Sequence, residues 1–225
     1  WADFVQAATK WDGLSEGLYW YLAHMQYVWG IDEALEDDPD FEDDQDDEED
    51  EGEEDRPRKL SRWERIICER TPLTAEQRSQ GAIDVAWFQR TYQQLTAKRW
   101  EMMSTAAKCA ASPAQAKRAG FIADVLLGKA SKKVLIDGIV KKNLTENVRL
   151  LGLLPLAAGA RRDADIADRY EVLQEYRRYA NRLSSMSRPD ALQASDIGLR
   201  NLASIAGYAD PMRLQWALEA ESTKD

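Results

Sequence analysis

Apolar residues recur along most of this chain at intervals of three and four positions, the spacing that predicts amphipathic α-helices. Near the N-terminus, two such runs occupy residues 4–11 and 18–29, and both are rich in aromatic residues. Asp12-Gly13 separates the runs, and Ser15 is a suitable N-cap for the second one. The pattern therefore predicts a helical hairpin over residues 1–31, with its second helix packed deeply in the core.

The middle of the chain predicts two further helices. Pro72 ends the first, and Thr74 with Gln77 three positions later has the pattern of a capping box that opens the second. We expect this second helix to continue until Pro113, with Gly81 kinking its start.

Helix boundaries are clearest in the last half of the chain. Pro113 suits the first position of a helix, and Gly128 and Gly207 suit helix ends. Asp210 precedes a proline and is expected to cap the last helix. The apolar junction at residues 150–156 contains both glycine and proline, which favours a helix end followed by a turn.

No segment shows the sustained alternation that is typical of β-strands. Helix pairs recur every 35–45 residues, about the length of HEAT repeats, although no side-chain pattern repeats with them. We therefore predict an all-α fold, either an irregular multi-helix stack or a HEAT-like helical array. Residues 59–225 are expected to form one helical domain.

Charge is distributed very unevenly along this chain. Its net charge is −10, yet residues 32–55 alone hold 18 acidic side chains and no Lys or Arg. The other 201 residues hold 22 acidic and 30 basic side chains, a net charge of +8. Like charges at this density repel one another and leave few apolar residues to bury, so we expect a disordered acidic linker over residues 32–58.

Few residues could carry out catalysis or bind a metal. His24 is the only histidine, which excludes a multi-histidine zinc site, and we interpret it as a packed structural residue. A calcium-loop reading that starts at Asp47 puts Arg58 where a bidentate Glu is needed. Cys68 and Cys109 fit free thiols in a reducing cytosol. We expect no catalytic residue, no cofactor and no metal.

Other features bear on location and partners. The longest apolar stretch is far shorter than the ~20 residues that a bilayer requires, so we expect a cytoplasmic protein without a membrane partner. The chain begins with Trp1 rather than Met, so we expect it to be part of a longer protein. A basic body could meet phosphates through five pairs of adjacent residues: Lys98-Arg99, Lys132-Lys133, Lys141-Lys142, Arg161-Arg162 and Arg177-Arg178.

Several segments of the C-terminal part resemble a known family. They are residues 169–176, residues 198–203, and the motif Gly-Tyr-Ala-Asp-Pro-Met-Arg-Leu-Gln-Trp-Ala-Leu-Glu at 207–219. Over roughly residues 125–220 the chain resembles the bacterial MolR-like (molybdate metabolism regulator-like) proteins, which contain a domain of unknown function. The resemblance implies a long, mostly helical protein and no established catalytic residues. The stretch Ser184–Arg188 departs from the family's pattern.

Within the resembling motif, four residues form a candidate ligand or interaction surface: Asn201, Tyr208, Arg213 and Trp216. The structural alternative is that Asn201 bonds to a neighbouring segment and Tyr208 packs back on its own helix.

Taken together, these features favour a non-catalytic helical scaffold or interaction module of a larger bacterial regulatory protein. Its partner would be another protein or other domains of the same chain. The alternative is a nucleic-acid-associated regulatory module whose basic surface is shielded by the acidic segment. An enzyme is the third interpretation.

Overall fold

The computed structural model describes residues 1–25, 62–110 and 113–222. Within these ranges the chain forms eleven α-helices and one short 3-10 helix, and no β-strand. The predicted all-α class is therefore confirmed, as a stack of helices. The predicted acidic linker over residues 32–58 lies outside the described residues.

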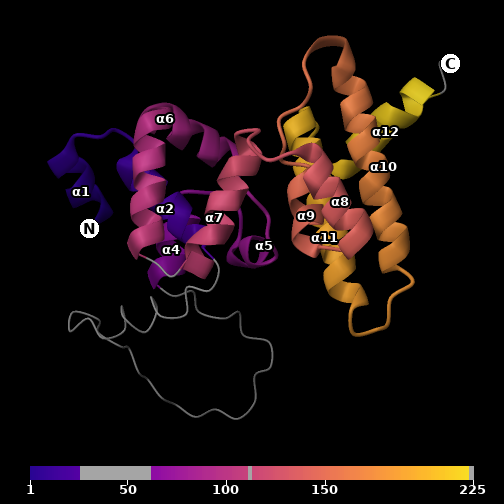
Figure 1. The fold of residues 1–225 in the computed structure, drawn as a ribbon, viewed down its shortest axis with the longest axis horizontal. Coiled ribbons are helices and arrows are strands. Elements are labelled where there is room, and N and C mark those ends of the chain that lie inside the picture. The colour runs from indigo at the N-terminus through magenta and orange to yellow at the C-terminus, as the bar shows by residue number, and fades with distance from the viewer. Residues whose placement is uncertain (26–61, 111–112, 223–225) are drawn as a thin grey trace, which may run out of the picture.

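The first six helices gather into one body (Figure 1). Their bounds are α1 (Ala2–Thr9), α2 (Leu14–Ala23), α4 (Arg62–Cys68), α5 (Ala75–Ser79), α6 (Val85–Ala110) and α7 (Pro113–Leu126). Helix α2 packs against both α1 and α6. The N-terminal hairpin therefore belongs to the same body as the helices that follow the acidic segment.

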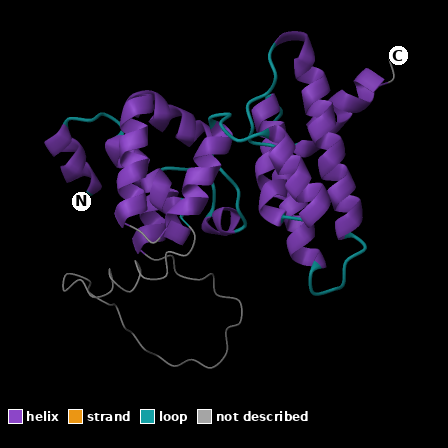
Figure 2. Cartoon of the chain, viewed as in Figure 1, coloured by secondary structure: helices purple, strands orange, loops and turns teal. Residues whose placement is uncertain are grey.

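The remaining helices form a second body beside the first, and short loops join them (Figures 1 and 2). Their bounds are α8 (Lys132–Lys142), α9 (Thr145–Leu151), the 3-10 helix η1 (Gly159–Arg161), α10 (Arg162–Ala180), α11 (Arg188–Ala206) and α12 (Pro211–Ser222). Helix α11 is central, because α9, α10 and α12 all pack against it.

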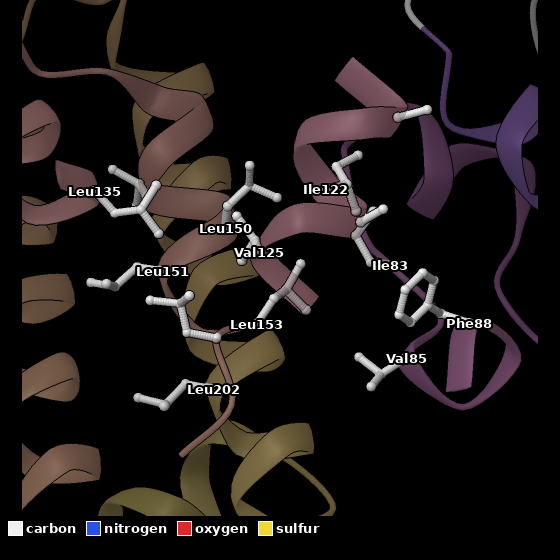
Figure 3. Close-up of a cluster of buried hydrophobic side chains, with 14 of the residues drawn as sticks. Ile83, Val85, Phe88, Ile122, Val125, Leu135, Leu150, Leu151, Leu153 and Leu202 are labelled. Atoms are coloured by element: carbon white, nitrogen blue, oxygen red, sulfur yellow. The ribbon is translucent and has the colours of Figure 1, made fainter. Parts of the chain in front are cut away.

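One hydrophobic core runs through both bodies. Val125 of α7 faces Leu150 and Leu153 of the second body (Figure 3), and all three side chains are essentially inaccessible to solvent. Polar contacts reinforce this junction, since Arg118 Nε lies 3.1 Å from Glu146 Oε1. The two bodies therefore share buried apolar surface, which is the main source of stability in folded chains.

Most of the predicted helix boundaries are confirmed. Thr74 and Gln77 form the capping box at the start of α5, and α7 begins at Pro113. Gly128 and Gly207 have φ angles of 70° and 87°, the left-handed conformation that suits glycine. Asp210 Oδ1 accepts a hydrogen bond of 2.8 Å from the backbone N–H of Arg213, as expected of a helix cap.

The prediction that Ser15 caps the second helix is wrong. Gly13, with a φ of 81°, occupies the N-cap position and α2 begins at Leu14. The Ser15 hydroxyl instead donates a 2.5 Å hydrogen bond to Asp3, and its backbone N–H donates to Gln6. Ser15 therefore ties α2 to α1.

The single helix expected between Thr74 and Pro113 is also wrong. Helix α5 ends at Ser79, and Gly81, with a φ of 98°, lies in the turn before α6. Helix α6 has a kink of its own at Thr96, whose φ of 67° and ψ of 158° are not helical. A β-branched residue rarely adopts such a φ. The presence of threonine at this position therefore gave no reason to predict a kink.

Candidate functional site

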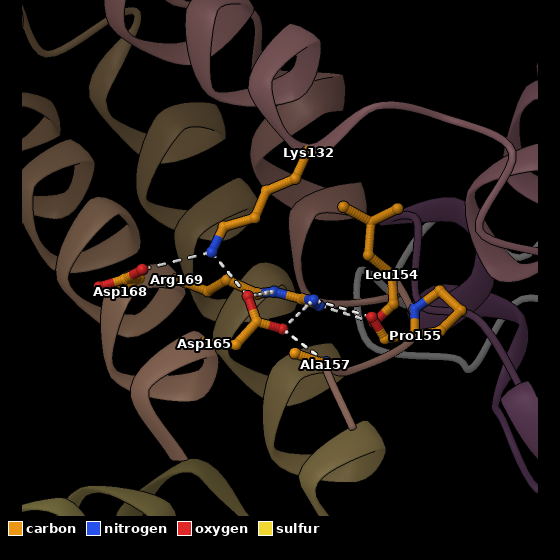
Figure 4. A network of polar contacts seen from close by, with 7 residues as sticks. All are labelled: Lys132, Leu154, Pro155, Ala157, Asp165, Asp168 and Arg169. Carbon is orange, nitrogen blue, oxygen red and sulfur yellow. Dashed lines mark hydrogen bonds and ion pairs between the residues drawn. The ribbon is translucent and has the colours of Figure 1, made fainter. Parts of the chain in front are cut away.

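A buried arginine connects α10 to the loop that follows α9. Arg169 is 2% exposed. Its Nη1 donates to the carbonyl of Leu154 at 2.6 Å, and its Nη2 donates to the carbonyl of Pro155 at 2.9 Å (Figure 4). Nη2 and Nε also donate to Asp165, one turn earlier on α10, at 2.5 and 3.2 Å. The guanidinium is therefore held on two sides, which compensates for its burial.

Asp165 completes this network, which we call the Arg169 hub. Its carboxylate also accepts from Lys132 Nζ at 2.6 Å and from the Ala157 backbone N–H at 3.0 Å. Burial alone would raise the pKa of the Asp165 carboxyl, but the hydrogen bonds from Lys132, Ala157 and Arg169 outweigh it and hold the pKa below its ordinary value. The Arg169 guanidinium and the Asp165 carboxylate both have several partners, so the hub anchors α10 to the loop that follows α9.

Two of the four predicted surface residues lie against the body of the protein. Asn201 is 3% exposed, and its Nδ2 donates to the carbonyl of Arg149 at 2.8 Å. It thereby satisfies one of the carbonyls near the end of α9 that have no partner within that helix. Tyr208 is half-buried, packs against the hydrophobic core, and its backbone N–H donates to Ala203.

The other two predicted residues are exposed together on α12. Trp216 is 59% exposed, and the Arg213 guanidinium lies 3.4 Å from Asp210 at the helix start. Met212, one turn before Trp216, is 60% exposed on the same side of the helix. We call the surface formed by Met212, Arg213 and Trp216 the α12 face.

The opposite side of α12 is well anchored. Leu214 is fully buried and Leu218 packs against the core. Met212 was not among the predicted surface residues. Its spacing of four from Trp216, on the side of the helix away from Leu214 and Leu218, is the signal that could have identified it. The structure therefore joins Arg213 and Trp216 with Met212, and separates them from Asn201.

His24 is a packed residue, as expected from its place in an aromatic helix. Its ring is 3% exposed and stacks on Trp20 with 4.4 Å between ring centroids. Nδ1 lies 2.7 Å from the Trp20 carbonyl oxygen, which can only accept, so Nδ1 carries the proton. Burial lowers the pKa of His24 to about 4. Nε2 is buried and has no hydrogen-bond partner within the described part of the chain, so the ring is packed in its neutral form.

An open hollow of about 490 Å³ lies where α1, α2 and the middle of α6 meet. Three acidic side chains line it: Asp3, Asp12 and Glu16. Two of them have other partners, since Asp3 accepts from Ser15 and Glu16 accepts from Trp87 Nε1 at 2.8 Å. Among the described residues, no group of three or more His, Cys, Asp or Glu side chains is arranged to hold a metal ion. In the same part of the chain, no helix has both the length and the apolar character needed to cross a membrane.

Comparison with known families decides where this chain belongs. Residues 1–218 match a family of unknown function, DUF5724. The chain belongs to this family. The DUF5724 match includes both helical bodies and the acidic segment, and nothing in it links the chain to MolR-like proteins. No curated protein and no solved structure matches the chain.

Proposed function

We propose that this DUF5724 chain is a non-catalytic helical interaction module that binds a protein partner through the α12 face. The observation that supports this most is the exposure of Met212 and Trp216, each about 60%, on one side of a helix whose other side is buried. Trp, Met and Arg are the side chains most enriched at protein interfaces, and tryptophan is the commonest hot-spot residue.

The exposure is not a sign of a loosely held helix. Leu214 is completely buried and Asp210 caps the first turn, so α12 is fixed to the body while its outer side faces solvent. A single exposed apolar residue is ordinary on any surface. Two large ones, one turn apart and beside an arginine, form the kind of cluster that a partner desolvates.

The proposed setting rests on the resemblance of residues 125–220 to MolR-like proteins. In this proposal the module belongs to a longer cytoplasmic bacterial protein with a regulatory role, and its partner is another domain of that protein or a separate protein. An immunoblot of the native host tests the first part. A band far above 25.6 kDa supports it, and a band at 25.6 kDa contradicts it.

The alternative, binding of nucleic acid through the basic surface, has less support. Of the five basic pairs, four give at least one member to an ion pair within the fold. Examples are Lys141 with Asp137 at 2.9 Å and Arg177 with Asp196 at 2.7 Å. In the remaining pair, Arg99 lies over the ring of Trp11. Cations that are already paired contribute less to a phosphate-binding surface.

Affinity purification from host cells tests the proposed function. Three tagged proteins are compared: the wild type, the double variant Met212→Ala/Trp216→Ala, and Met186→Ala as a matched control. Met186 is 91% exposed but lies away from α12, in the turn before α11. Loss of a hot-spot tryptophan costs about 2 kcal/mol or more, which is roughly a 30-fold loss of affinity.

The proposal expects a defined partner to be retained by the wild type and Met186→Ala and lost by the double variant, with all three proteins equally stable to urea. A partner that is retained equally by all three proteins would contradict the α12 face as the binding surface.

A further inference from the structure

Helix α8 also has exposed aliphatic side chains, on the outside of the C-terminal body. Its inner side is well packed, because Leu135 and Ile139 are buried and Gly138 backs onto Asn147 of α9. Val134 and Val140 are each 64% exposed and lie at the two edges of its outer side, with the Asp137–Lys141 ion pair between them. Leu144, just beyond the helix end, is 44% exposed. Aliphatic side chains with this much exposure are not needed to hold α8 in place.

The segment that contains α8 is rich in lysine. Residues 129–142 contain five lysines and one acidic residue, Asp137. Lys132 turns inward to Asp165, and Lys141 pairs with Asp137 at 2.9 Å. Among the described residues, the other three lysines (Lys129, Lys133 and Lys142) have no ion-pair partner. We call Val134, Val140, Leu144 and these three unpaired lysines the α8 stripe.

We propose that the α8 stripe binds the acidic segment of this same chain, residues 32–55. The charges are complementary, because that segment carries 18 acidic side chains and no basic one, whereas the rest of the chain has a net charge of +8. The segment also contains Leu35 and Phe41, apolar side chains that the exposed valines can accept.

The chain is long enough for this contact. The described residues resume at Arg62 after Met25, so 36 residues lie between them. At about 3.3 Å per residue they span up to about 120 Å, which permits an excursion of about 60 Å and return. A compact body of this size is about 40 Å across. A tethered segment is also present at an effective concentration of about millimolar, so even weak contacts are populated.

Zero-length crosslinking with a carbodiimide tests this in the full chain, because the reagent joins a carboxylate only to an amine that touches it. At about 10 mM salt, we expect crosslinks from residues 32–55 to concentrate on Lys133 and Lys142. Exposed lysines of the N-terminal body, Lys98, Lys108 and Lys117, are the reference. At about 1 M salt, where charges are screened beyond about 3 Å, the α8 crosslinks should fall to the reference level.

The reference lysines make the test stringent, since the acidic segment is anchored at both ends to the N-terminal body. A segment that samples the surface without preference would label these lysines as often as those on α8 or more often. An even distribution over exposed lysines, or one that favours Lys98, Lys108 and Lys117, would overturn the proposal.

A variant separates the apolar contribution from charge alone. In Val134→Ser/Val140→Ser both substituted positions are largely exposed, so the fold is retained, and we expect the α8 crosslinks to drop toward the reference level. Met186→Ser is the control and should leave them unchanged. Unchanged α8 crosslinks in the double variant would mean that the valines take no part, and would refute the α8 stripe as a specific site.

Mixing isotope-labelled and unlabelled chains identifies the donor of the acidic segment. We expect crosslinks to α8 to remain within one chain at low micromolar concentration. Crosslinks that join labelled to unlabelled chains would assign the contact to a second copy and overturn the intramolecular proposal.

Discussion

Acidification should weaken this fold through His24, the ring that α2 buries against Trp20. The neutral ring already donates its one proton to the Trp20 carbonyl. Protonation would add a second N–H at Nε2, which is buried and has no acceptor among the residues that the structure describes. It would also put a positive charge near Arg118 and Arg78, which oppose it, and near Asp84, which favours it.

The magnitude follows from the two pKa values of His24, about 4 in the folded chain and 6.5 in the unfolded chain. Because the unfolded chain binds the proton first as pH falls, stability is complete above about pH 6.5 and is lost down to about pH 4. The loss amounts to about 2 kcal/mol at pH 5 and about 3 kcal/mol at pH 4. That is a large fraction of the stability of an ordinary domain.

Urea denaturation between pH 7.5 and pH 4.5 measures this effect, with His24→Gln as the matched variant. Glutamine keeps an N–H donor for the Trp20 carbonyl but does not titrate. Asp165, whose pKa is lowered, loses its contribution only below about pH 4, outside the measured window. We expect the wild type to lose about 2 kcal/mol more than the variant on going from pH 7.5 to pH 5. Parallel pH profiles would refute the claim that His24 is buried in the neutral form.

Two further substitutions test the packing of the C-terminal body. Arg169→Met leaves the Asp165 carboxylate with only Lys132 and the Ala157 N–H as named partners, and should cost about 3 kcal/mol in urea denaturation. The exposed Arg178→Met on the same helix should change stability by less than about 0.5 kcal/mol. Gly152→Ala would place a Cβ 2.5 Å from the carbonyl oxygen of Gly198 on α11, so the backbone must shift. We expect the free energy of unfolding to fall by about 1–3 kcal/mol, and the melting temperature to fall with it. A wild-type melting temperature for Gly152→Ala, or equal losses for the two arginine variants, would contradict the contacts described.

Local signals predicted the helix boundaries well because each boundary depends on a few adjacent residues. The capping box at Thr74 and the glycine at 207 need only their own helix to form. Ser15 failed as a cap because its hydroxyl and N–H bond to α1, a contact that depends on how two helices pack. The kink at Thr96 has no composition signal at all, since threonine is a poor residue for its φ.

The residues of the candidate site show the same division. The spacing of Asp165 and Arg169 on one helix side was visible in the sequence, but their partners, the carbonyls of Leu154 and Pro155, become neighbours only through the tertiary fold. Asn201 was grouped with Arg213 because both lie in one motif, yet α11 turns Asn201 inward and α12 turns Arg213 outward. A sequence motif shows proximity along the chain, whereas a surface depends on which side of each helix is buried.

Site-specific photo-crosslinking in host cells tests the α12 face most directly. A photoreactive phenylalanine analogue is placed at Trp216, and in a separate protein at Met186, and both are irradiated in intact cells. The account predicts a discrete adduct from position 216, lost when Met212→Ala is added, and none from position 186. No adduct at position 216, or the same adduct from both positions, would contradict the claim that this face binds a partner.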